Sequence, residues 1–185
     1  MYKKTRFLIA VFGLLAGCFP PSSLHPIYTE KDLIFEPGLL GTWSPDNSSE
    51  TWSFSAHDPT SYRLVVKDDE GAEGIFMVHL VEIDGKRFLD LLPEDLDDAM
   101  TDFFLPLHMF LFVEQIEPLR TRSMEHDWLS EYTEENPETI QHAKIDDRIV
   151  LTAPTEELQE FVLRHLKTQG AFSEPSDMIR RKAAN

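Results

Sequence analysis

The sequence predicts an all-β protein: an eight-stranded, antiparallel, up-and-down barrel with a C-terminal α-helix and a short helical insertion. Several short segments alternate apolar and polar residues with a period of two, which is typical of strands that bury one face. These segments follow one another through turns rich in Asp, Asn, Gly and Pro, and such turns favour hairpins between neighbouring strands. A meander of eight strands can close on itself and leave no unpaired edge, so a barrel is favoured over an open sheet.

Eight segments are predicted as strands, and in chain order they span residues 39–44, 50–56, 62–67, 74–83, 87–92, 107–116, 119–124 and 147–153. The second segment carries Trp52 and Phe54 at alternate positions, so both side chains fall on one face. The dipeptide Asp84-Gly85 closes a tight hairpin between the fourth and fifth segments.

Two helices complete the prediction. A short helix over residues 127–135 is inserted before the last predicted strand. The closing helix begins at Thr155, a favourable N-cap residue, and ends at Gly170. Its apolar residues recur at the spacing of one helix face, and they are Leu158, Phe161, Val162, His165 and Leu166.

The first residues have the layout of a secretory signal peptide. A basic stretch with Lys3, Lys4 and Arg6 precedes the apolar residues 7–16, and small residues follow before Cys18. A membrane-spanning helix needs roughly 20 apolar residues, which argues against a transmembrane anchor here.

Cys18 is the one cysteine of the chain, and Leu15-Ala16-Gly17-Cys18 resembles the bacterial lipobox. In that motif the thiol receives a diacylglycerol, and cleavage before the cysteine frees an amine that is also acylated. The resemblance implies that Cys18 is the lipid attachment site and anchors a periplasm-facing protein to a membrane of the cell envelope. By resemblance to enterobacterial sorting signals, Phe19 in place of Asp favours the outer membrane in a cell with two membranes. The alternative is a buried free cysteine in a protein core.

Gly41-Thr42-Trp43, on the first predicted strand, resembles the Gly-x-Trp motif of lipocalins and related calycin barrels. In that family the tryptophan plugs the closed end of the barrel and an arginine from the last strand stacks over it. The resemblance implies that Trp43 is this plug, with Arg148 at the start of the last predicted strand as its partner and Arg122 as the other candidate. The alternative is that Trp43 is an ordinary core tryptophan.

The mature chain also resembles a widespread group of uncharacterised bacterial lipoproteins, and this resemblance implies no particular activity. It is carried by three stretches, Tyr28-Thr29-Glu30-Lys31-Asp32-Leu33, Leu39-Leu40-Gly41-Thr42-Trp43 and Thr152-Ala153-Pro154-Thr155-Glu156-Glu157-Leu158. The predicted organisation is a signal peptide over 1–17, a lipidated N-terminus and tether over 18–37, a lipocalin-like barrel domain with its C-terminal helix over 38–172, and a flexible tail over 173–185.

The strongly acidic charge argues against binding to nucleic acid, because a negative domain repels phosphate backbones. The formal net charge is −16, and loss of the signal peptide with its three positive residues changes it to −19. With one cysteine, an intrachain disulfide is impossible.

No motif predicts a catalytic residue, a metal site or a cofactor. The seven histidines lack the spacings of zinc sites, although His79 and His108 fall within predicted strands. The chain has no Gly-x-Ser-x-Gly motif, and an acylated Cys18 offers no free thiol. The acidic run 94–98 lacks the spacing of a calcium loop and is predicted as a solvated turn.

Three functions remain open. The first is a non-enzymatic lipoprotein whose barrel holds a small apolar or amphipathic ligand, with Trp52, His108, Phe110 and Phe112 lining the cavity. The second is a structural or interaction module that contacts an envelope protein through its surface, with the segment 126–145 as the contact. The third is an enzyme, which would need a pocket with paired carboxylates and a perturbed histidine.

Overall fold

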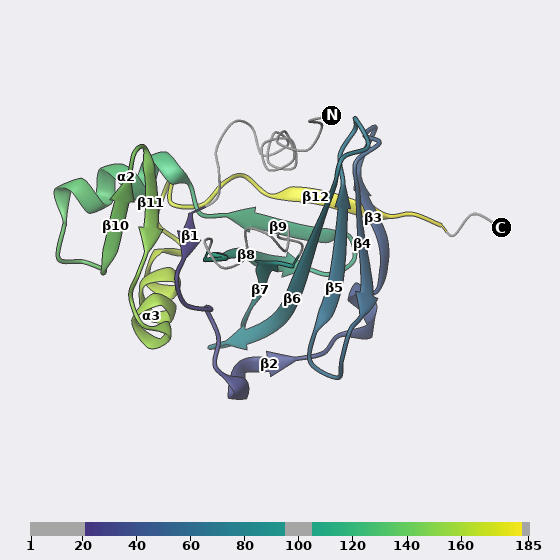
Figure 1. Cartoon of the computed structure of the whole chain (residues 1–185), viewed down its shortest axis with the longest axis horizontal. Coiled ribbons are helices and arrows are strands. Elements are labelled where there is room, and N and C mark those ends of the chain that lie inside the picture. The colour runs from purple at the N-terminus through teal and green to yellow at the C-terminus, as the bar shows by residue number, and fades with distance from the viewer. Residues whose placement is uncertain (1–20, 95–104, 183–185) are drawn as a thin grey trace, which may run out of the picture.

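The computed structural model describes residues 21–94 and 105–182, in which twelve strands form one continuous sheet (Figure 1). Three features predicted from the sequence lie outside the described residues: the signal peptide, the lipid attachment site at Cys18, and residues 95–98 of the acidic run. Within the described ranges, no helix combines the length and the apolar character that a membrane crossing requires.

Eight of the strands close into an antiparallel barrel, which confirms the predicted fold class. Seven strands follow one another as a meander, and the eighth lies between the first and the seventh and closes the ring. In chain order they are β3 (Gly41–Pro45), β4 (Thr51–Ala56), β5 (Tyr62–Lys67), β6 (Glu73–Ile83), β7 (Lys86–Pro93), β8 (His108–Gln115), β9 (Leu119–Ser123) and β12 (Ser176–Arg180).

The closing strand is β12 and not the predicted strand 147–153, so the prediction of a flexible tail over 173–185 is wrong for β12. In β12 only Met178 is buried, so its sequence carries almost no periodic apolar signal. A closing strand is held by ladder hydrogen bonds on both sides, and these do not depend on side-chain type. The apolar run in 147–153 does form a strand, β11 (Arg148–Leu151), but this strand lies outside the barrel.

A second lobe is inserted between β9 and β12. It contains α2 (His126–Glu135), the hairpin of β10 (His142–Ile145) and β11, and the closing helix α3 (Thr155–His165). The lobe packs against the outer face of the barrel, where Ile83, Phe88 and Phe110 share one buried cluster with Leu158 and Phe161 of α3. Both predicted helices are therefore present, and together they cover one side of the barrel (Figure 1).

Residues 21–40, here called the strap, are folded where a tether was predicted. The strap contains β1 (Ser22–Ser23), the 3-10 helix η1 (Glu30–Asp32), β2 (Leu33–Ile34) and the 3-10 helix η2 (Pro37–Leu39). Strand β1 lies between β8 and β11, and β2 pairs with β6. A proline-rich composition is typical of linkers, but here the short apolar pieces between the prolines are buried between barrel and lobe.

Candidate functional site

The centre of the barrel, where a ligand cavity was predicted, is occupied by the protein's own side chains. Each barrel strand contributes at least one apolar residue to a cluster in which no member is more than 8% exposed. The members that are 0% exposed are Leu39, Trp43, Tyr62, Leu64, Val78, Leu80, Leu89 and Leu119. A completely buried side chain borders no space large enough for a water molecule, so these side chains leave no room for an apolar ligand between them in the described part of the chain.

The four residues predicted to line that cavity do not lie together. Trp52 contacts the barrel core from β4, and its indole Nε1 donates a hydrogen bond to Glu50 Oε1 at 2.8 Å. His108, Phe110 and Phe112 lie on the opposite face of β8, away from the interior, because Met109, Leu111 and Val113 are the residues that face inward. Phe110 and Phe112 pack into the cluster under the lobe. Their predicted place inside the barrel is therefore wrong.

Trp43 lies at one end of the barrel, completely buried, and its Nε1 donates to Leu39 O of η2 at 2.9 Å. The guanidinium over its ring belongs to Arg180 of β12, with Cζ 4.2 Å from the ring centroid. Arg180 also donates to the carbonyls of Gly38 and Leu40 and, at 3.1 Å, to Glu117 Oε2. The guanidinium of Arg180 thus binds backbone carbonyls of and next to η2 and at the same time stacks on the indole of Trp43.

The arginine assignments made from the sequence are wrong for this position. Arg148 begins β11 in the lobe, and the guanidinium of Arg122 lies 6.0 Å from the ring centroid of Phe172. The sequence predicts residues 147–153 as the eighth barrel strand, which makes Arg148 the expected partner of Trp43. The eighth barrel strand is instead β12, and its arginine is Arg180. Gly41 leaves room for Arg180: its φ is +119°, and an added Cβ would lie 2.8 Å from Arg180 Nη1.

A buried polar cluster lies between the strap and the outer face of the barrel, and it is the strongest candidate site among the described residues. Its centre is Asp90 of β7, which is 0% exposed. Asp90 Oδ2 accepts the backbone N–H of Ile27 at 3.0 Å, and Oδ1 lies 2.7 Å from Nδ1 of His108. A carboxylate accepting at Nδ1 places the ring proton there and leaves Nε2 of His108 as the basic nitrogen.

His79 of β6 and Tyr28 of the strap complete the polar cluster. The Tyr28 hydroxyl lies 3.0 Å from Nδ1 of His79, and their ring centroids are 4.7 Å apart. Burial, with a smaller contribution from the negative charge of Asp90, raises the pKa of Tyr28 to about 12. Burial lowers the pKa of His79, although Asp90 opposes this shift. The neutral forms of both groups are therefore favoured at neutral pH.

The polar cluster contains a pair of residues arranged like a general base and its orienting carboxylate, and it has a clear structural role. The Asp90–His108 pair has the geometry of a general base with its orienting carboxylate. Ser23 lies opposite His108 in the β1–β8 pair, but Ser23 is completely buried and its hydroxyl donates to His25 O at 2.8 Å. Within the described residues no three His, Cys, Asp or Glu side chains converge as metal ligands do. The arrangement instead fastens the strap, through Ile27 and Tyr28, to the barrel.

Helix α3 clamps the strap from its other side. Gln159 Nε2 donates to Ile27 O at 2.9 Å and to Asp32 Oδ2 at 3.0 Å. Thr155 Oγ1 donates to Pro26 O at 2.9 Å. The strap is therefore bound by polar contacts to both the barrel and the lobe, and it joins the two.

His165, which is buried, lies in an aromatic cage in the lobe. Its ring centroid is 5.0 Å from that of Trp128, 4.8 Å from that of Tyr132 and 4.8 Å from that of Phe161. Nδ1 lies 3.2 Å from Thr168 Oγ1, whereas the buried Nε2 has no hydrogen-bond partner in the described part of the chain. Burial, and to a lesser degree the neighbouring Arg164, lowers the pKa of His165.

Acid is expected to destabilise the folded protein through His165 and His79. Their pKa values are lowered from the ordinary value of 6.5, so the unfolded chain binds more protons than the folded one. The contribution of these two neutral histidines to the free energy of unfolding is therefore fully present above about pH 6.5. It is lost as the pH decreases from there through the folded-state pKa values. His165→Phe keeps a ring in the cage and removes one titrating group, so urea denaturation between about pH 7.5 and 5.5 should show a smaller loss of stability than in the parent.

The exposed His57 provides the matched control. His57→Gln should keep the pH dependence of the parent protein. If His165→Phe also keeps it, the buried ring does not titrate in this range.

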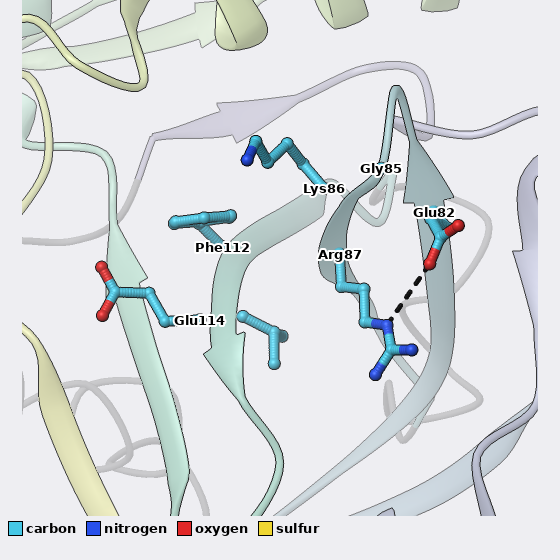
Figure 2. A pocket seen from close by; sticks show the side chains of 7 residues that line it. Glu82, Gly85, Lys86, Arg87, Phe112 and Glu114 are labelled. Carbon is cyan, nitrogen blue, oxygen red and sulfur yellow. Dashed lines mark hydrogen bonds and ion pairs between the residues drawn. The ribbon is translucent and has the colours of Figure 1, made fainter.

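An open pocket of about 500 Å³ lies outside the barrel, beside the β6–β7 hairpin (Figure 2). Its lining residues are Glu82, Gly85, Lys86, Arg87, Phe112, Val113 and Glu114. Arg87 Nε pairs with Glu82 Oε2 at 3.4 Å, and Glu114 lies 3.6 Å from Arg122, so most of the charges are neutralised locally. Lys86 has no such partner in the described chain, and Figure 2 shows its amine on the side of Phe112.

The roles of Asp90 and Arg180 were not predicted from the sequence, for different reasons. Asp90 had a usable signal, because it is a lone carboxylate between Leu89 and Leu91 in a predicted strand, and a buried acid needs partners. Arg180 lies among other basic residues in a segment with no clear period, so nothing local distinguishes it.

The chain was compared with protein-family models, curated proteins and solved structures, and no comparison finds a match. The described residues contribute a filled barrel, a fastened strap, an open pocket and the surface of the lobe.

Proposed function

We propose that this protein is a lipid-anchored, non-enzymatic lipoprotein of the cell envelope, whose domain works as an interaction module for an envelope protein. The packed centre of the barrel carries the proposal, since the inner side chains of residues 21–94 and 105–182 fill the space where an internal ligand would lie. The anchor is Cys18, through the lipobox resemblance of Leu15-Ala16-Gly17-Cys18. The same resemblance favours a periplasm-facing position and, in a cell with two membranes, the outer membrane.

The contact surface proposed for the partner is the acidic face of α2. This face consists of Asp127, Glu131, Glu134 and Glu135, all of them exposed. Like charges at i, i+4 destabilise a helix by about 0.2–0.5 kcal/mol per pair, and Asp127, Glu131 and Glu135 follow that spacing. In the described structure Glu134 pairs with Lys144 and Asp127 lies 3.3 Å from Nδ1 of His126, whereas Glu131 and Glu135 have no ion-pair partner there. A partner with a basic surface would relieve this repulsion, so basic residues are expected on its side.

Crosslinking in cells tests the proposal. A photo-crosslinking residue at position 131 of the full-length lipoprotein should capture a discrete envelope protein, because this position lies in the acidic face. The same residue at position 160, an exposed glutamate of α3, is the matched control and should capture much less. Charge reversal with Glu135→Lys should lower the yield at 131. Equal yields at 131 and 160, or none at either, would contradict the proposal.

A second candidate function is the binding of a small amphipathic anion in the pocket beside Phe112. Lys86 supplies a cation without an ion-pair partner in the described chain, and Phe112 supplies an aromatic surface. Native mass spectrometry of the lipoprotein extracted from cells separates the two functions. A co-purified molecule that is lost in Lys86→Glu would favour the second, whereas protein without such a molecule favours the interaction module.

A further inference from the structure

We infer that the tip of the β10–β11 hairpin, residues 144–148, lies against the bilayer in which the lipoprotein is anchored. The inference rests on the proposed lipid anchor at Cys18. It adds an orientation: which surface of the domain meets the lipid, and through which side chains.

The anchor point and the folded domain are separated by very little chain. Ser22 already belongs to the sheet, where it pairs with Met109 of β8 and with Val150 of β11. The path from Cys18 to Ser22 covers four residues, and four residues span at most about 14 Å. The acylated cysteine must lie at the lipid surface, so the bilayer lies within about this distance of Ser22.

The register of β1 identifies what else lies at that level. β1 runs parallel to β11, with Ser22 opposite Val150 and Ser23 opposite Leu151. Four residues back along β11 from Val150 lead to Asp146, at the turn of the hairpin. Because β1 and β11 are parallel, the start of β1 and the hairpin turn lie on the same side of this register, and the turn is about as far from Ser22 as four residues of chain can reach. In the other direction the strap leads away to η1 and β2, at the bottom of Figure 1.

The side chains at the tip suit a lipid surface. Ile145 is 57% exposed, so its side chain has no covering in this structure; among the described residues, Leu105 and Ile179 are the other large apolar side chains that are strongly exposed. Its neighbours are Lys144, Asp146, Asp147 and Arg148, whose formal charges cancel. The rest of this strongly acidic protein is repelled by anionic headgroups, whereas a neutral tip with an exposed isoleucine is not.

A fluorescent label at Ile145 tests the orientation. The acylated Cys18 has no free thiol, so Ile145→Cys introduces a single reactive site for an environment-sensitive NBD label. The full-length lipoprotein is reconstituted into vesicles of phosphatidylethanolamine and phosphatidylglycerol that contain nitroxide-labelled lipid. Quenching at position 145 should be at least twofold stronger than at Lys31→Cys, an exposed position of η1 in the middle of the strap. Asp147→Cys, a second exposed tip position, should be quenched like Ile145→Cys.

Intact mass measured on the same preparation separates the two possible failures. A mass without acyl groups at Cys18 overturns the proposed anchor, and the orientation falls with it. An acylated protein whose label at 145 is quenched no more than the label at 31 overturns the orientation and leaves the anchor standing.

Discussion

Trp43→Ala is expected to lower the free energy of unfolding by about 3–5 kcal/mol, the range found when a buried aromatic side chain is truncated to alanine. The indole is completely buried, donates to Leu39 O and lies beneath the guanidinium of Arg180. Its removal would leave a cavity at the end of the barrel and a cation with no ring to cover. Single domains are stable by about 5–15 kcal/mol, so the loss should be visible as a large shift in the urea midpoint.

Trp52→Ala provides the control, because the two tryptophans face each other in the β3–β4 pair. Trp52 is only partly buried, so its truncation should cost about 1–2 kcal/mol. Equal losses for the two variants would show that Trp43 contributes no more to stability than its partly buried neighbour on β4.

Asp90→Ala is expected to cost a similar amount, about 3–5 kcal/mol, because removal of one member of a buried hydrogen-bonded pair leaves the other without a partner. The variant would leave Nδ1 of His108 and the N–H of Ile27 buried and unsatisfied. The damage should be concentrated in the strap. Hydrogen exchange should therefore show faster exchange of the Ile27 amide than of the amides in β5, beyond the change expected from global destabilisation.

Asp32 is the matched acidic residue for this experiment. It lies in the same strap, where it accepts from Thr29 at the start of η1 and from Gln159 of α3, so Asp32→Ala should cost about 1 kcal/mol, the loss typical of a helix cap. If Asp90→Ala costs no more than Asp32→Ala, or leaves strap exchange unchanged, the polar cluster does not hold the strap.

The barrel meander could be predicted because β4 and β5 alternate apolar and polar residues and the turns between neighbouring strands from β3 to β7 are short. Strand β8 could not be oriented in the same way. Its two faces are Met109, Leu111, Val113 and His108, Phe110, Phe112, and both are largely apolar because one faces the barrel and the other is covered by the lobe. Alternation reveals a strand only where one face meets water, so the predicted cavity residues were placed on the wrong side.

The strap and β12 were missed for a different physical reason. Both are held mainly by backbone pairing and by long-range polar contacts, such as Ile27 with Asp90 and Arg180 with the carbonyls of η2. Such contacts join residues that are 63 or 140 positions apart, and the local sequence of either segment does not predict them.

The place of β12 has a consequence for biogenesis. The strand that completes the ring is the last of the described strands to leave the ribosome, and its partner β3 is among the earliest, with Met178 opposite Pro45. Until it arrives, β3 and β9 each offer an open ladder to other polypeptides, a situation that invites self-association. A premature stop between α3 and β12 would therefore yield a domain whose barrel is not closed, and chaperones and proteases act on such domains.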